Sequence, residues 1–522
     1  MKKALISIIL GITTIAATAQ SQQFGYNNPV IPGFNPDPSV CRVGDDYYLV
    51  TSTFQYFPGV PVYHSKDLIH WEQIGNCLTR ESQLNLKGAS SNGGIYAPTI
   101  RYHEGLFYMV TTNVTGKGNF FVTAKDPAGE WSDPVWLESE GIDPTIYFEG
   151  DKAYLLSNPR NCIWINEIDL KTGKSLNTAK PIWEGDGGRY PEAPHIYKKD
   201  GWYYLLIAEG GTEMAHSITI ARSRDIYGPY ESNPDNPILT NCQRIAQTKE
   251  IQGTGHGDLI EDHQGNWWIV FLGFRPKIGL HHLLGRETNL EPVSWEEGEW
   301  PVVNGNGTAD IINQVTTLPQ VEMPEPGEDR LAARKIGPQF LYLYNPVKGN
   351  YFFTDSGSLR LKSTDVSLDD RTSPSFIGIR QDKFDFTLET EVSLSSATTG
   401  DIAGLTVYME NNAHADVYVR QDKSKKKQSI VVEYTLYGLK HKALEVETDK
   451  GAHQLRVVGT ENDYTFWYKD EKGKWNEAGK LDARFLSTET AGGFTGVILG
   501  MYAVSRQGNG HSCADFGCFN YR

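Results

Sequence analysis

The sequence predicts an all-β protein in which a five-bladed β-propeller is followed by a β-sandwich domain. Three observations predict it: a repeated strand–turn–strand unit up to about residue 310, a proline-rich break after the last repeat, and alternating apolar residues beyond the break. A chain of 522 residues is also too long for a single core, so more than one domain is expected.

Each repeat opens with a short residue pair and continues as a hairpin. The five openings are Asp37-Pro38, Ala97-Pro98, Asp143-Pro144, Ala193-Pro194 and Gly257-Asp258. An Asp or Gly suited to a tight turn follows each opening at a constant offset, and aromatic residues come next. Successive openings are 60, 46, 50 and 64 residues apart. This spacing fits a four-stranded propeller blade, whereas the alternative, a solenoid, usually has shorter and more uniform repeats.

The stretch TTLPQVEMPEPG, from Thr316 to Gly327, loses periodicity and gains proline, as linkers do. Apolar residues then alternate with polar ones, as at Phe384–Leu394, which predicts half-buried strands. We therefore expect a propeller over 24–315, a linker over 316–337 and a sandwich over 338–522.

The N-terminus predicts an exported protein. Lys2 and Lys3 precede an apolar run, and Ala17-Thr18-Ala19 resembles a cleavage site, so residues 1–19 read as a signal peptide. The location would be the periplasm of a two-membrane bacterium and otherwise the exterior. No later stretch is apolar enough for a membrane anchor.

Composition excludes some partners. The net charge of −15 argues against nucleic acid. The six cysteines form no CxxC pair, so we expect buried thiols rather than a zinc ribbon. The sequence specifies no oligomeric state.

Three of the repeat openings carry acids, namely Asp37, Asp143 and Glu192, and His256 opens the fifth repeat. In a propeller the first strand of each blade lines the central axis, so these residues should converge. Glycosidic cleavage needs a proton donor and a base or nucleophile, and a third carboxylate can raise the pKa of the donor. Asp37 and Asp143 share a register, whereas Glu192 and His256 lie one residue earlier. Convergence therefore requires irregular openings rather than ideal strands.

The stretch NPVIPGFNPDPSVCRVGDDYYLVTSTFQYFPGVPVYHSKDLIHW resembles glycoside hydrolase family 43, close to its β-xylosidase and α-L-arabinofuranosidase members. SNGGIYAP, GIDPTIYFEG, PEAPHIY, AEGGT, TGHGD and LGRET continue the resemblance in order. FTGVILGMY and ADFGCFNY resemble the closing strands of the concanavalin-like accessory sandwich of that group.

The resemblance implies a five-bladed propeller that hydrolyses with inversion. It implies that Asp37 is the general base, that Glu192 is the general acid, and that Asp143 tunes and orients the acid. It also implies a sugar pocket whose binding residues are Phe54, Tyr96, Ala97, His256, Arg286 and Phe494, the last reaching over from the sandwich. No cofactor is expected to be required. A central cation such as calcium near His256 is an alternative to an orienting role for that histidine.

The expected function is exo-acting release of terminal pentose, β-D-xylose and/or α-L-arabinofuranose, from xylan-type or arabinose-containing plant glycans. One alternative is a retaining, fructan-active propeller hydrolase. Such enzymes carry an arginine before the middle aspartate, where this chain has Ile142. Another alternative is a non-catalytic sugar-binding propeller, which would leave Glu192 unexplained.

Overall fold

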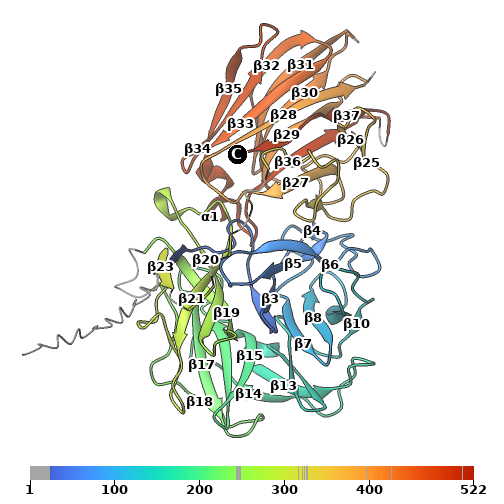
Figure 1. Cartoon of the computed structure of the whole chain (residues 1–522). Helices are drawn as coiled ribbons and strands as arrows, with labels where there is room; N and C mark the ends of the chain where they lie inside the picture. The colour runs from blue at the N-terminus through green and yellow to red at the C-terminus, as the bar shows by residue number, and fades with distance from the viewer. Residues whose placement is uncertain are drawn as a thin grey trace, which may run out of the picture.

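The computed structural model describes residues 24–522 except 243–248, 316, 320, 323, 325–326, 397, 425 and 508–509. The predicted signal peptide lies outside the described residues. Strands dominate the described chain, and the helical segments are short. They are α1 (Thr488–Ala491) and the 3-10 turns η1 (Pro159–Asn161), η2 (Ile278–Leu280) and η3 (Ala483–Leu486). Figure 1 shows two bodies, a blue-to-yellow N-terminal one and an orange-to-red C-terminal one. The predicted all-β class is confirmed.

Within the described residues, the N-terminal body contains five four-stranded antiparallel sheets, and each pairs its strands in chain order, with β4 (Tyr56–Phe57) left out of the first. The first sheet is β2 (Ser39–Val43), β3 (Asp46–Val50), β5 (Gly59–Ser65) and β6 (Glu72–Leu78). The second is β7 (Thr99–His103), β8 (Leu106–Asn113), β9 (Gly118–Ala124) and β10 (Val135–Trp136). The third is β11 (Thr145–Glu149), β12 (Lys152–Ser157), β13 (Ile163–Ile168) and β14 (Lys180–Trp183). The fourth is β15 (Glu192–Lys199), β16 (Trp202–Glu209), β17 (Ser217–Ser223) and β18 (Glu231–Ser232). The fifth is β19 (Gln252–Glu261), β20 (Trp267–Phe274), β21 (Glu287–Ser294) and β22 (Val302–Val303).

The first strands of the five sheets form a closed ring. β2 contacts β7, β7 contacts β11, β11 contacts β15, β15 contacts β19, and β19 returns to β2. The sheets are therefore the blades of a five-bladed propeller, and their inner strands surround one axis. A separate two-stranded ladder joins β1 (Phe24–Asn27) to β23 (Ile312–Val315), so the start of the propeller is tied to its end.

Asp258 links several blades at the axis. Its fully buried carboxylate accepts hydrogen bonds from Ser39 Oγ at 2.7 Å, Arg101 Nη1 at 2.7 Å and the Tyr197 hydroxyl at 2.6 Å. These donors come from the first, second and fourth blades, whereas Asp258 belongs to the fifth. Burial of the carboxylate raises its pKa, but the Arg101 charge and the donated hydrogen bonds outweigh burial and lower it.

The C-terminal body is a sandwich of two antiparallel sheets. One sheet runs β25 (Tyr351–Phe353), β26 (Leu359–Lys362), β37 (Cys513–Phe516), β28 (Phe386–Ser395), β33 (Ala452–Gly459), β34 (Asp463–Lys469) and β35 (Trp475–Asp482), with β38 (Asn520–Tyr521) beside β28. The other runs β27 (Ser375–Arg380), β36 (Ile498–Val504), β29 (Ile402–Glu410), β30 (Ala413–Gln421), β31 (Lys427–Leu436) and β32 (Leu439–Asp449). Within β28, buried and more exposed residues alternate, as the period-two pattern predicted.

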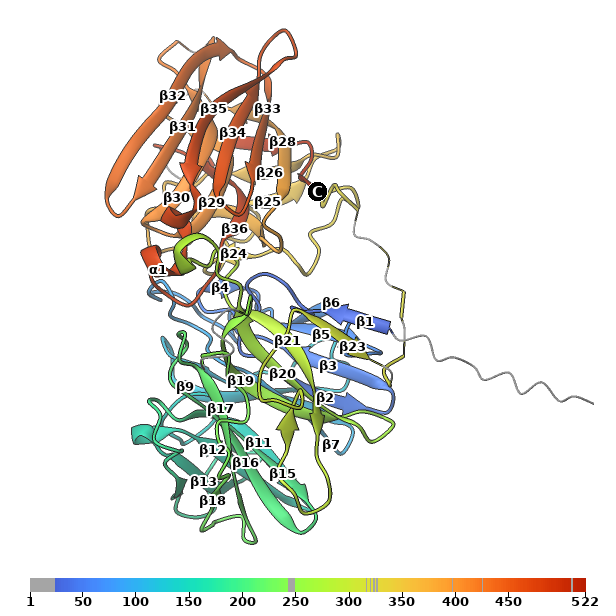
Figure 2. The ribbon, with the colours of Figure 1, turned by 90° about the vertical axis from the view of Figure 1, so that its left-hand side faces the viewer.

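The two bodies share a continuous apolar core. A short ladder pairs β4 (Tyr56–Phe57) with β24 (Tyr342–Leu343), and Figure 2 shows both near the junction. Phe34 of the propeller and Tyr408 of the sandwich belong to one buried cluster. The Arg380 side chain also donates a 2.6 Å hydrogen bond to the Phe34 carbonyl. Interfaces of this kind hold domains in a fixed orientation, so the sandwich is placed to take part in a propeller site.

Cys41, Cys77 and Cys162 are buried thiols, as expected, whereas Cys513 and Cys518 are half-buried. Across the described residues, no helix combines the length and apolar character that crossing a bilayer requires.

Replacing Asp258 with alanine should destabilise the propeller strongly, because Arg101 would be left largely buried without its partner. Breaking a buried pair in this way costs about 3–5 kcal/mol. Urea unfolding followed by tryptophan fluorescence measures the loss. Arg80→Ala is the control, since its ion-pair partners Glu130 and Asp133 are exposed and the unfolding midpoint should move far less. Equal shifts for the two variants would contradict the linking role of Asp258.

Candidate active site

One cavity of about 320 Å³ gathers the residues that the sequence singled out. All nine predicted site residues line it, although they are distributed from position 37 to position 494. They are Asp37, Phe54, Tyr96, Ala97, Asp143, Glu192, His256, Arg286 and Phe494. The cavity lies where the propeller axis meets the sandwich, since all but Phe494 belong to the propeller.

Unusual backbone conformations bring the acids together. Asp37, Asp143 and His256 have positive φ angles of 56°, 51° and 47°, and Ala193, next to Glu192, has 54°. The ladder of β15 is irregular directly after Glu192, and that of β19 shifts register around His256. Such conformations are uncommon for residues other than glycine and cost on the order of 1–3 kcal/mol each. The blade openings are therefore irregular, which removes the register conflict between Asp37 and Glu192.

Asp37 is buried and held in its ionised form. Arg286 Nη1 donates to its Oδ1 at 2.8 Å, Ser52 Oγ donates to its Oδ2 at 2.5 Å, and His256 Nδ1 lies 3.6 Å from Oδ1. Burial alone raises the pKa of Asp37. The Arg286 charge, His256 and the Ser52 hydrogen bond together outweigh burial and hold that pKa below the ordinary aspartate value. At neutral pH this carboxylate is negative and able to accept a proton.

Glu192 and Asp143 have the opposite tendency. Burial, with repulsion from Asp37, raises the pKa of Glu192 to about 7 against the opposing Arg286 charge. Burial and repulsion from Glu192 raise the pKa of Asp143. Two neighbouring buried carboxyls of this kind share a proton and titrate as a pair. The Ala193 amide donates to Asp143 and opposes this rise, but burial and the neighbouring carboxylates outweigh it.

Arg286 connects the acids to the sandwich. Besides Asp37, it donates to Thr212 Oγ1 at 3.0 Å and to the Phe494 carbonyl at 3.3 Å. The Phe494 ring stacks on Phe54, with 5.8 Å between the centroids, and Tyr96 packs against both rings. Asn92 accepts a hydrogen bond from the Phe494 amide at 2.7 Å and donates to Glu410. The sandwich therefore contributes part of the pocket wall.

His256 lies on an inner strand, beside charged residues of the propeller axis. Burial lowers the pKa of this histidine, against the opposing Asp37 charge, so its ring is neutral at pH 7. The Arg101 guanidinium balances Asp258 and lies 2.8 Å from His195 Nδ1. Within the described chain, no group of three or more His, Cys, Asp or Glu residues is arranged to hold a metal ion. Arg101 thus balances the charge of Asp258 at the inner strands.

Sequence reasoning missed five further lining residues, Ile142, Tyr190, Gly211, Thr212 and Glu213. Two of them lie inside AEGGT, which the family resemblance had already singled out, and Tyr190 is two positions before Glu192. Their proximity to these motifs was the available signal. Strand periodicity does not reveal which loops surround the mouth of the cavity, so the other lining residues could not be predicted.

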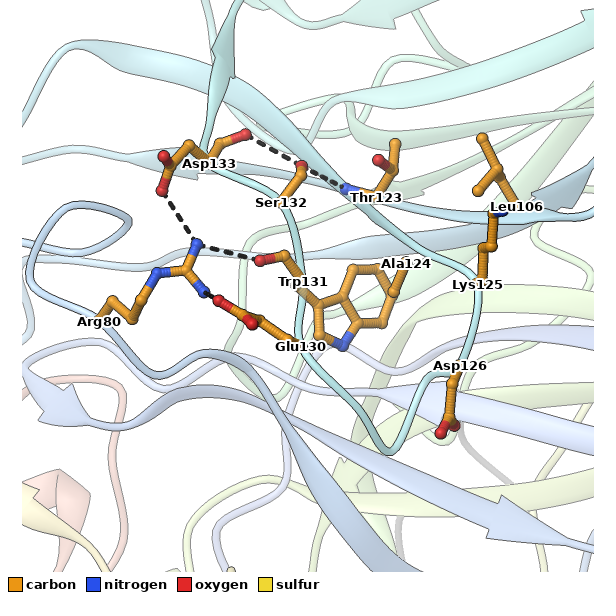
Figure 3. A pocket seen from close by; sticks show the side chains of 10 residues that line it. All are labelled: Arg80, Leu106, Thr123, Ala124, Lys125, Asp126, Glu130, Trp131, Ser132 and Asp133. Carbon is orange, nitrogen blue, oxygen red and sulfur yellow. Dashed lines mark hydrogen bonds and ion pairs between the residues drawn. The ribbon is translucent and has the colours of Figure 1, made fainter.

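A wider hollow of about 620 Å³ on the second blade offers a contrast (Figure 3). Its main charged groups satisfy one another: Arg80 donates to Glu130, to Asp133 and to the Trp131 carbonyl. No pair of buried carboxyls faces this hollow among its lining residues. The axial cavity is therefore the candidate site.

Comparison with known proteins identifies the family of the chain. The model of glycosyl hydrolases family 43 matches residues 26–301. The chain belongs to this family. A second model, the β-xylosidase C-terminal concanavalin A-like domain, matches residues 328–522. The family resemblance seen in the sequence is confirmed, and the protein is a glycosidase.

Relatives match over almost the whole chain. The non-reducing end alpha-L-arabinofuranosidase of Bacteroides ovatus is 40% identical, with 99% of this chain and 98% of that protein covered. A xylosidase/arabinosidase of Butyrivibrio fibrisolvens is 38% identical, with 94% and 98% covered. The solved structure of xylan beta-1,4-xylosidase from Bacillus halodurans C-125 superposes with a TM-score of 0.88 at 33% identity, covering 95% of this chain and all of that one.

The charge arrangement predicts a bell-shaped dependence of kcat/KM on pH. The basic limb should lie near pH 7, where Glu192 loses its proton, and the acidic limb below pH 3.8, where Asp37 gains one. Asp143→Asn removes the carboxyl with which Glu192 shares a proton and should move the basic limb down by about one pH unit. The profile is measured on an aryl pentoside. A basic limb that stays in place would show that Asp143 does not raise the pKa of the acid.

Proposed function

We propose that this family 43 glycosidase releases single terminal pentose units, β-D-xylose and/or α-L-arabinofuranose, from xylan-type or arabinose-containing plant glycans with inversion of configuration. One observation carries the proposal: a single pocket holds Asp37, whose lowered pKa keeps it ionised, and Glu192, whose pKa is raised to about 7 and so favours its protonated form. The base and acid of an inverting hydrolysis are these two species.

In the proposed reaction, Asp37 accepts a proton from a water molecule as the water oxygen attacks the anomeric carbon. The bond from that carbon to the leaving oxygen breaks, and Glu192 donates its proton to the leaving oxygen. Asp143 shares a proton with Glu192, so the pair carries one negative charge rather than two and a proton stays available to the leaving oxygen. Arg286 holds Asp37 in place and presents donors to the sugar hydroxyls.

The size and walls of the pocket support action at chain ends. A volume of about 320 Å³ lies at the small end of ligand sites, which suits one sugar unit rather than a long segment. Phe54 and Phe494 stack across one side, and Tyr96 packs beside them. Aromatic faces of this kind pack against the apolar faces of sugar rings.

The substrate class is supported by the relatives. Proteins named arabinofuranosidase, xylosidase/arabinosidase and beta-xylosidase align with nearly the full chain. Discrimination between two pentoses that differ by a few contacts is worth only a few kcal/mol. We therefore propose that one pocket accepts both sugars.

The retaining alternative requires a nucleophile close to the acid, with carboxyls about 5–5.5 Å apart, whereas an inverting pair is about 6.5–9.5 Å apart. Arg286 and Ser52 each donate a hydrogen bond to one carboxylate oxygen of Asp37, an arrangement that suits a positioned base.

A purely sugar-binding propeller would have no use for buried carboxyls with opposed pKa shifts, since such groups are costly and are typical of catalytic sites.

We also propose that the protein is exported by its predicted signal peptide, residues 1–19, and works in the periplasm or outside the cell. The division into a propeller at 24–315, a linker at 316–337 and a sandwich at 338–522 is part of the same proposal. The ring of five blades and the two packed sheets support this division.

Proton NMR of an early reaction mixture should show the α-anomer of xylose first when a β-xyloside is cleaved, because water attacks from the face opposite the leaving group. The β-anomer should appear only as mutarotation proceeds. Early appearance of the β-anomer would instead establish retention and remove Asp37 from the role of base.

Glu192→Gln should lower kcat/KM on xylobiose by about 10²–10⁴-fold, since the leaving sugar needs a proton. Activity on a dinitrophenyl pentoside should fall far less, because that leaving group departs as an anion. Steady-state kinetics on both substrates provides the comparison. Glu167→Gln, an ion-pair partner of Lys152 on the third blade, is the matched control with unchanged kinetics. Equal losses on the two substrates would argue against the acid role of Glu192.

A further inference from the structure

Tyr190 is a half-exposed aromatic residue at the edge of the acid pocket. It lines the same cavity as Glu192, and its side chain is 52% exposed. The two phenylalanines of the pocket are more buried, Phe54 at 3% and Phe494 at 36%. Packing of the core therefore does not account for the ring of Tyr190, which remains available to a ligand.

The position of Tyr190 relative to the acid defines which part of a substrate it meets. Glu192 protonates the oxygen that leaves, so the departing sugar lies on the Glu192 side of the cleaved bond. Asp37 and the attacking water lie on the other side. Tyr190 is joined to Glu192 through Pro191 alone and lines the same cavity, so it is the exposed aromatic side chain that the sequence places beside the acid.

The ring is held in place by the neighbouring loop. A Cβ added to Gly211 would lie 3.1 Å from Tyr190 Cδ2, so the ring packs closely over this glycine. The Arg189 guanidinium lies 5.4 Å from the ring centroid. The same guanidinium donates to the Gly210 carbonyl at 3.1 Å and to Glu213 at 3.0 Å.

The backbone joins these loops as well, since the Gly210 amide donates to the Arg189 carbonyl at 2.7 Å. Tyr190 itself has a φ of 54°. A side chain fixed by its neighbours before binding loses little conformational freedom when a ligand arrives, and affinity benefits from this.

We propose that Tyr190, positioned by Arg189, Gly211 and Glu213, is the platform of a subsite for the sugar ring that leaves, a neutral pyranose or furanose of the glycan chain. The flat ring packs on the apolar face of that sugar, and Arg189 and Glu213 offer a donor and an acceptor to its hydroxyls. This inference rests on the proposed function, because the position of the departing sugar follows from the role of Glu192.

A second aromatic-lined hollow, on the outer face of the sandwich sheet, is a weaker candidate for a glycan site. Its single aromatic residue, Trp475, is covered by the Arg456 guanidinium, 3.8 Å from the ring centroid. At the acid pocket, Arg189 lies farther from the Tyr190 ring, at 5.4 Å, and that ring is half exposed.

The test compares substrates with and without a departing sugar. Tyr190→Asn removes the ring and keeps a residue that tolerates the positive φ. It should lower kcat/KM on xylobiose by about tenfold, as loss of a well-packed aromatic contact does. On β-D-xylosyl fluoride, which has no departing sugar, the change should stay within about twofold. Tyr190→Phe is the control and should retain both activities, since it keeps the packing face. Should arabinosides be the better substrates, arabinobiose and α-L-arabinofuranosyl fluoride replace the xylose pair.

Equal losses of Tyr190→Asn on the fluoride and the disaccharide, or no loss on either, would overturn the proposal. Binding separates this outcome from failure of the proposed function. In the Glu192→Gln background, calorimetry should show that Tyr190→Asn weakens binding of xylobiose but not of xylose. If the wild-type protein cleaved no pentoside, this binding difference would still decide the role of Tyr190, and its absence would refute it.

Discussion

The buried ion pair between Arg286 and Asp37 is the interaction on which the arrangement of the pocket depends. Asp37 belongs to the first blade and Arg286 to the fifth, so the pair joins the two ends of the ring. A buried carboxylate without a partner would cost several kcal/mol. Arg286 offsets that cost and also donates to the Phe494 carbonyl. One guanidinium therefore links the base on the first blade, the fifth blade and the sandwich.

The same ion pair explains how neighbouring carboxyls acquire different charges. Burial raises the pKa of each acid, but Arg286 and Ser52 bond Asp37 directly, whereas Glu192 receives no comparable donor among its described contacts. The proton therefore stays with the Asp143–Glu192 pair. Elsewhere on the inner strands, Arg101 likewise donates to Asp258 and balances its charge. Arg286 and Arg101 thus keep Asp37 and Asp258 ionised, and the strained backbone of the blade openings places the acidic side chains near the axis.

Sequence patterns were informative where periodicity and position in a repeat decide the structure. The repeated openings predicted which residues face the axis, and the alternation in β28 predicted the sandwich. The positive φ angles of Asp37 and Asp143 could only be inferred as a requirement, since no side-chain pattern specifies them. The β4–β24 ladder was missed because two-residue strands have no period. Tyr190 was missed for a related reason: its exposure depends on how a loop packs over Gly211.

The central claim is that one pocket keeps Asp37 charged and Glu192 protonated. A carbon-13 NMR titration of protein labelled at the glutamate side-chain carboxyl tests it most directly, with the Glu192 signal assigned by its disappearance in Glu192→Gln. The account predicts a midpoint near pH 7 for this signal. A midpoint near 4.5, the ordinary value for a glutamate, would show that burial and the neighbouring carboxylates do not protonate this group and would contradict the account.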